Sequence, residues 1–167
     1  MSVLGERWGV TDDEVALPYP CDEYVTAPAL QLWRGVSIDA SPADVWVWVR
    51  QIQLAPYSYD WLDNLGKRSP RERRDVTDPR PGEPFSRVGG RFAVGQVLAA
   101  VPGEHLTARI MGAVMSYVMR ADGQQTRLLL KIVIARRTWY STAVAIGDWP
   151  MARRQLLNLK RLAERGH

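Results

Sequence analysis

Two charged side chains stand inside runs that are otherwise apolar or aromatic, and they are the first candidates for chemistry. Arg34 falls on the apolar side of an alternating run, and Asp60 precedes Trp61 in an aromatic segment. A buried charge needs an opposite charge or an anionic ligand group to offset its desolvation. Arg34 and Asp60 are therefore expected to pair at the polar end of an interior site. Simpler roles stay open, because Arg34 can lie at a strand end and Asp60 can cap a helix.

Three tyrosines add phenol groups that could act on a bound molecule. Tyr57, Tyr59 and Tyr117 can each donate a hydrogen bond or a proton to a carbonyl or phenolate oxygen. His105 follows a Pro-Gly-Glu turn and is expected at an exposed strand start, which makes it a weaker candidate for a general base. The chain has no Gly-x-Ser-x-Gly, phosphate-loop, His-Glu-x-x-His or dinucleotide motif. We therefore expect no cofactor.

The counts of metal-binding residue types exclude several kinds of site. Cys21 is the single cysteine, and His105 and His167 are the only histidines. An intramolecular disulfide and a thiolate-only zinc site are thus excluded, and no metal is expected.

The 167 residues, with 46% hydrophobic and 24% charged side chains, match one ordinary globular domain spanning residues 1–167. No stretch is apolar enough for membrane insertion, and residues 1–13 lack the order of a signal peptide. These features predict a cytoplasmic protein and leave the oligomeric state open.

The net charge of +4 is unevenly distributed along the chain. Residues 1–66 hold three basic and ten acidic side chains, whereas residues 67–91 hold eight basic and four acidic ones. Residues 149–167 hold five basic side chains and one acidic one. A basic surface can attract nucleic acid or an anionic membrane, but interleaved charges usually only solvate a surface. Nucleic acid is therefore not expected as a partner, and a basic docking module is kept as an alternative.

The first half of the chain predicts an arm, a strand and two short helices. Residues 1–29 contain three prolines and no sustained period, which indicates an extended arm. Residues 30–38 alternate as a half-buried strand does. Ser41, Pro42 and Asp44 are typical of a helix start, so a helix is expected to run to Ile52. A second helix is predicted over 58–65, where Trp61, Leu62 and Leu65 have the spacing of an apolar stripe. A long surface loop is predicted over 67–90.

The second half predicts an antiparallel meander followed by a long helix. Strands are expected over 95–101, 105–111, 113–120 and 126–135, with Arg109, Arg120, Arg127 and Lys131 pointing outward. The predicted inner faces carry Leu106, Ala108 and Ile110, then Met115, Tyr117 and Met119, then Leu128, Leu130, Ile132 and Ile134. A helix is expected from Trp149 to Glu164, with its apolar stripe formed by Trp149, Ala152, Leu156, Leu159 and Ala163.

Two segments also resemble a known family. Residues 36–46, VSIDASPADVW, look like the opening strand-to-helix signature of the START-like (SRPBCC) superfamily, which includes polyketide cyclases, lipid-transfer domains and plant allergens of the Bet v type. Residues 56–66, PYSYDWLDNLG, are similar to a segment of actinobacterial members. The resemblance covers the chain from about Leu30 to Glu164. It implies an α+β helix-grip fold, in which a curved antiparallel sheet wraps around the long C-terminal helix.

The resemblance also implies an apolar cavity between the sheet and that helix. The expected function is binding of a hydrophobic or aromatic small molecule, and the expected partner is that ligand. The alternative is a cyclase or dehydratase that acts on a polyketide-like molecule. The residues expected to line the site are Arg34, Tyr57, Tyr59, Asp60, Trp61, Ala108, Ile110, Met115, Tyr117, Met119, Leu130, Ile132, Leu156 and Leu159. Without the family resemblance, the same residues could simply fill a hydrophobic core.

Overall fold

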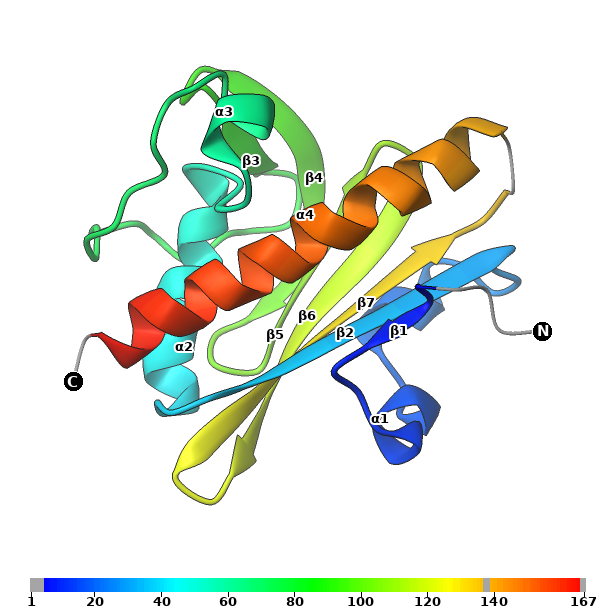
Figure 1. The fold of residues 1–167 in the computed structure, drawn as a ribbon, viewed down its shortest axis with the longest axis horizontal. Helices are drawn as coiled ribbons and strands as arrows, with labels where there is room; N and C mark the ends of the chain where they lie inside the picture. Colours follow the sequence, from blue (N-terminus) through cyan, green and yellow to red (C-terminus); the bar gives the residue numbers. More distant parts are fainter. Residues whose placement is uncertain (1–4, 137–138, 166–167) are drawn as a thin grey trace.

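One curved sheet and one long helix crossing it make up most of the molecule (Figure 1). The computed structural model describes residues 5–136 and 139–165. For residues 139–149 it describes the backbone only. The helical elements are α1 (Asp12–Ala16), η1 (Pro20–Glu23), α2 (Pro42–Arg50), η2 (Gln51–Gln53), α3 (Asp60–Asp63) and α4 (Trp139–Glu164). The strands are β1 (Arg7–Trp8), β2 (Leu30–Ile38), β3 (Pro84–Val88), β4 (Phe92–Val101), β5 (His105–Ile110), β6 (Ala113–Asp122) and β7 (Gln125–Ile134).

The sheet has the order β1-β2-β7-β6-β5-β4-β3. The meander from β3 to β7 is antiparallel, β2 joins β7 along its whole length, and only the two-residue β1 pairs in parallel, with β2. The predicted inner faces of β5, β6 and β7 are confirmed in the main core, which includes Leu106, Tyr117 and Leu130. The alternation of side chains along each strand thus determines which residues face α4.

The predicted start of α2 is confirmed by its capping contacts. The Ser41 hydroxyl accepts a hydrogen bond from the Asp44 amide at 3.2 Å and donates to the Asp44 carboxylate at 2.7 Å. Pro42 occupies the first helical position. Val45, Trp46, Trp48 and Val49 of this helix are buried. The cap therefore fixes where the chain leaves β2 and turns back over the core.

Several elements differ from the sequence prediction, and the arm predicted to be extended contains the short helical elements α1 and η1. β3 lies within the segment predicted as loop 67–90; it is a short edge strand that begins with Pro84, where a missing amide is tolerated. Helix α3 is only four residues long, and its predicted apolar side chains Trp61, Leu62 and Leu65 are exposed. Helix α4 begins ten residues before Trp149 and contains Pro150 in its interior. The side chain of Trp149, predicted as an anchor, lies outside the described part of the structure.

The N-terminal arm covers the outer face of the sheet, so two side chains predicted to point outward are not open to solvent. Lys131 is buried, and its Nζ lies 2.6 Å from the Asp22 carboxylate and over the rings of Tyr19 and Trp33. Arg127 Nε lies 2.8 Å from the Glu14 carboxylate. Arg109 and Arg120 are exposed as predicted. A second, smaller core thus forms beneath the arm.

Candidate functional site

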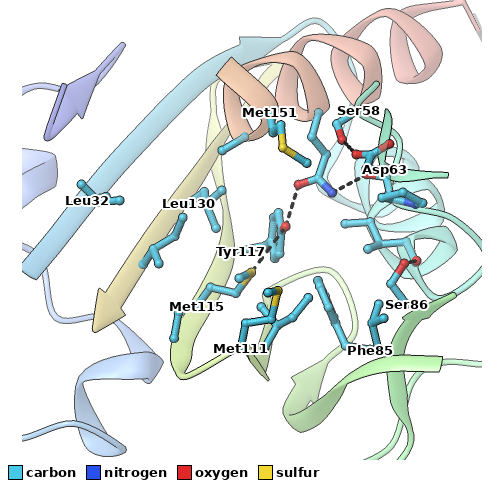
Figure 2. A pocket seen from close by; sticks show the side chains of 18 of the residues that line it. Leu32, Ser58, Asp63, Phe85, Ser86, Met111, Met115, Tyr117, Leu130 and Met151 are labelled. Carbon is cyan, nitrogen blue, oxygen red and sulfur yellow. Dashed lines mark hydrogen bonds between the residues drawn. The ribbon is translucent and has the colours of Figure 1, made fainter. Parts of the chain in front are cut away.

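A cavity of about 400 Å³ lies between the inner face of the sheet and α4 (Figure 2). Its sheet side is formed by β2, β7, β6 and β5, and its opposite side by Met151, Ala152 and Gln155 of α4. Ile52, Pro56, Phe85 and Val88 close the remaining sides. Most of the lining is apolar, so the space is suited to a molecule that water solvates poorly.

Methionines line several sides of this cavity. Met111 is 68% exposed, Met151 is partly exposed, and Met115 is buried. In Figure 2 their side chains lie on opposite sides of the space, with Met151 above and Met111 and Met115 below. An exposed Met111 places one edge of the cavity at the surface. The methionine side chain is flexible and polarisable, so this lining can adapt to different shapes.

A short hydrogen-bonded chain crosses the cavity wall. The Tyr117 hydroxyl donates to Gln155 Oε1 at 2.6 Å, and Gln155 Nε2 donates to the main-chain oxygen of Pro56 at 2.6 Å. The ring of Tyr117 stacks with Phe85, with 6.2 Å between centroids and 27° between planes. These hydrogen bonds fix the orientation of the Tyr117 phenol inside an apolar space. A fixed polar group in such a space is suited to orienting a ligand.

Asp63 is the single carboxylate that lines the cavity among the residues the structure describes. Its carboxylate accepts a hydrogen bond from the Ser58 hydroxyl, as drawn in Figure 2. Burial raises the pKa of Asp63 from 3.8 to about 6. A carboxyl group with that pKa can exchange a proton near neutral pH, which a group with an ordinary carboxyl pKa does poorly.

The raised pKa makes a prediction about stability. The folded state holds the Asp63 proton more tightly than the unfolded chain does, so stability falls as pH rises from about 4 to 6. Asp63→Asn should therefore raise the free energy of unfolding by about 1 kcal/mol at pH 8, allowing for solvent screening of this half-buried group, and should add nothing at pH 3.5. Urea unfolding at both pH values measures this difference.

The matched control is Asp122→Asn, which removes an exposed carboxylate at the end of β6. It should leave the pH dependence of unfolding as it is in the original protein. An equal gain for Asp63→Asn at both pH values would show that the Asp63 proton is not coupled to folding.

The segment Pro56–Ser58 separates this cavity from a second hollow. Tyr57 has a φ of +57°, a backbone conformation that residues other than glycine adopt only at a cost in conformational energy. Asn158 Nδ2 donates to the main-chain oxygen of Tyr57 at 3.0 Å, and the Tyr57 hydroxyl accepts from Gln51 at 2.8 Å. Ser58 lines both spaces. The strained segment is thus held from several sides.

Apart from Arg34, the sequence-predicted site residues divide into three groups in the structure. Ile110, Met115, Tyr117, Leu130 and Ile132 line the cavity. Ala108, Met119, Leu156 and Leu159 lie in the core, away from the cavity lining. The third group lines the second hollow and consists of Tyr57, Tyr59, Asp60 and Trp61.

The predicted pair of Arg34 and Asp60 does not form. Arg34 is buried, and its Nη1 donates to the main-chain oxygens of Glu6 at 2.9 Å and Trp33 at 2.8 Å. Asp60 instead accepts a hydrogen bond from Ser69 at 2.5 Å. The reason is the register of the arm: β1 pairs with β2 at Trp8 and Arg34, and this pairing brings the carbonyl oxygen of Glu6, the residue before β1, to the guanidinium. The polar end of the cavity lies at Tyr117, Gln155 and Asp63.

Several lining residues were not found by sequence reasoning. Asp63 belongs to the same aromatic segment as Asp60, and Gln155 interrupts the apolar side of α4 next to Leu156. A polar residue inside an apolar stripe was a signal that could have identified Gln155. Phe85 was missed because its strand lies in a segment predicted as loop.

The comparisons with solved structures agree with this architecture. No family model matches the chain, and no curated protein matches it either. A Mesorhizobium loti protein, MLL2253, is 18% identical, with a TM-score of 0.54 over 82% of this chain and 98% of the other. The Staphylococcus saprophyticus protein SSP2350 is 11% identical, with a TM-score of 0.56 over 82% of this chain and 93% of the other. The chain has the α+β helix-grip fold.

A third similar structure is DynU16, a protein from the dynemicin biosynthetic locus. It is 15% identical, with a TM-score of 0.51, and the match covers 81% of this chain and 48% of DynU16. At such identities the likeness shows the fold alone, because one fold hosts many activities.

Neither a metal-binding cluster nor a membrane-spanning helix is found in the part of the chain that the structure describes. Among the side chains of residues 5–136 and 150–165, histidine, cysteine and acidic groups form no cluster of three or more that could hold a metal ion. None of the helices in this part of the chain is both long and apolar enough to cross a bilayer.

Proposed function

We propose that this protein binds one hydrophobic or aromatic small molecule in the cavity between the sheet and α4. The observation that carries the proposal is the cavity itself, which has a volume of about 400 Å³ and is lined almost entirely by apolar side chains. Small-molecule sites commonly measure about 300–1,000 Å³ and combine such a lining with a few convergent polar groups. Here those groups are Tyr117, Gln155 and Asp63.

The lining also describes the kind of molecule that would fit. The stacked rings of Phe85 and Tyr117 offer a flat apolar surface, and Met115 and Met151 offer adaptable contacts. The phenol of Tyr117 and the carboxyl of Asp63 would interact with one polar substituent. We therefore favour a compact aromatic or alicyclic ligand with a hydroxyl or carbonyl group.

Two measurements test the proposal directly. Native mass spectrometry of freshly purified protein should reveal a co-purified small molecule, and the emptied protein should bind the hydrophobic dye ANS in its native state. Aromatic alcohols such as 1-naphthol should displace the dye. If the folded protein bound neither the dye nor any of these compounds, the cavity would not be a binding site.

Removing one oxygen should separate polar from apolar recognition. In Tyr117→Phe the hydroxyl is lost while the stacked ring remains, so affinity for 1-naphthol should fall about fivefold to tenfold, as expected for one hydrogen bond. Affinity for naphthalene should change by less than about twofold. Tyr19→Phe is the matched control, because the Tyr19 hydroxyl donates to the main-chain oxygen of Glu14 on the outer face. Equal losses for both ligands would contradict a polar role for Tyr117.

A cyclase or dehydratase is the second candidate, favoured by one specific arrangement. Asp63, with a pKa of about 6, and the phenol of Tyr117 line the same cavity and could serve as proton acceptor and proton donor. An intramolecular aldol closure with loss of water needs a folded substrate and little more than such groups. The resemblance to the START-like superfamily, which includes polyketide cyclases, supports the same candidate.

Turnover distinguishes the two candidates once a polyketide-like ligand is in hand. An enzyme should release a dehydrated cyclic product, and Asp63→Asn should abolish that product while ligand binding persists. A binding protein should return the ligand unchanged.

A further inference from the structure

A second hollow of about 430 Å³ lies beyond the Pro56–Ser58 segment, and its lining is polar and basic. We call it the arginine hollow; it is defined by Tyr59, Trp61, Arg71, Arg154, Arg161 and Arg165. Neither the cavity proposed for the hydrophobic ligand nor its polar groups account for these residues. The hollow therefore calls for a function of its own.

Helical spacing brings three of the arginines to one place. Arg154, Asn158 and Arg161 lie along one face of α4. Arg165, one residue beyond the end of the helix, continues that face, and its amide donates to the Arg161 carbonyl oxygen at 3.3 Å. Arg71 joins them from the loop that follows α3. The hollow thus lies between two segments that are far apart in the sequence, the region around α3 and the C-terminal part of α4.

These four arginines have no carboxylate within ion-pair distance among the described side chains, those of residues 5–136 and 150–165, whereas Arg50, Arg73 and Arg127 each have one. One acid, Asp60, lines the hollow, and its carboxylate accepts a hydrogen bond from Ser69. Four cations around one concave space repel each other and attract an anion. A bound anion would supply the missing partner.

Aromatic side chains stand at the same place. Trp61 is 74% exposed and meets Tyr59 edge-on, with 6.5 Å between ring centroids. The guanidinium of Arg154 lies over the Tyr59 ring at 5.6 Å. An exposed indole beside guanidinium groups offers a stacking surface next to an anion site.

We propose that the arginine hollow binds a phosphorylated small molecule that carries a planar ring. Phosphate suits the hollow because guanidinium groups bind its oxygens in pairs and because it carries up to two negative charges. The concave shape and the volume fit a small molecule, whereas a flat basic surface fits a nucleic acid or a membrane. The ring would stack on Trp61.

Calorimetric titration with phenyl phosphate, adenosine 5′-monophosphate, inorganic phosphate and adenosine tests the proposal. Both phosphate esters should bind with one-to-one stoichiometry, inorganic phosphate more weakly, and adenosine weakest. Arg154→Gln combined with Arg161→Gln should weaken the esters at least about tenfold. Trp61→Ala should weaken phenyl phosphate about fivefold and leave inorganic phosphate unchanged.

The matched control is Arg153→Gln, which removes the same charge one residue away. Arg153 lies over the Trp8 ring at 4.8 Å and does not line the hollow. If Arg153→Gln weakened binding of the phosphate esters as much as the double variant does, the effect would come from the overall charge of the protein, and the proposed site would be wrong. Tighter binding of duplex DNA or anionic phosphatidylserine vesicles, with an affinity that falls steeply with salt, would also overturn the site. Binding of naphthalene, which carries no charge, should be unchanged in every variant, and this keeps the test separate from that of the hydrophobic ligand.

Discussion

Ala152→Trp is expected to abolish binding of apolar ligands while the protein stays folded. Ala152 is buried on α4 and lines the cavity opposite the sheet. An indole at this position would project into the space that the ligand would occupy, and the flexible Met115 and Met151 can move to accept it. Affinity for ANS should fall at least about thirtyfold, equivalent to roughly 2 kcal/mol. A fluorescence titration of the folded variant measures this change.

Two observations make the result interpretable. Ala43→Trp places the same side chain at an exposed position of α2, away from the cavity, and should bind ANS as the original protein does. Circular dichroism and urea unfolding show whether each variant is folded. A folded Ala152→Trp variant with unchanged affinity would place the dye outside the cavity and remove the main support for the proposed function.

Local signals in the sequence predicted the framework that forms the cavity. The Ser41 cap located α2, and period-two alternation predicted the inner faces of β5, β6 and β7. These features depend on neighbouring residues, so a single sequence reveals them. They did not reveal which inner-face residues border empty space. Ala108 and Ile110 lie on the same face of β5, but only Ile110 lines the cavity, because that depends on where α4 crosses the sheet.

The wrong predictions came from signals that have more than one structural meaning. Pro150 is one example, because proline favours the first turn of a helix, yet α4 begins at Trp139 and continues through this residue. The helical spacing of Trp61, Leu62 and Leu65 predicts a buried stripe, although these side chains are exposed. An exposed apolar residue is common at a protein surface, so spacing alone cannot place it.

One partner of Arg34 could not be predicted, because it is the main-chain oxygen of Glu6, 28 residues away in the sequence. Arg34 is buried, as its place in an apolar run predicts, but Asp60, the carboxylate predicted to pair with it, accepts a hydrogen bond from Ser69 instead. In the structure main-chain oxygens of Glu6 and Trp33 accept its hydrogen bonds. Backbone acceptors are present at every residue and leave no trace in the amino-acid sequence.

Leu156→Ala is expected to cost about 2–5 kcal/mol of folding free energy, as truncation of a fully buried leucine usually does. Leu156 lies one turn beyond Ala152, in the core where α4 packs on β2 and α2. A leucine that fills this contact holds the helix over the sheet, so its loss should also loosen the cavity. Urea unfolding measures the change, and Leu157→Ala, a truncation at a partly buried neighbour, should cost clearly less. Equal losses for the two variants would mean that α4 is not anchored through Leu156.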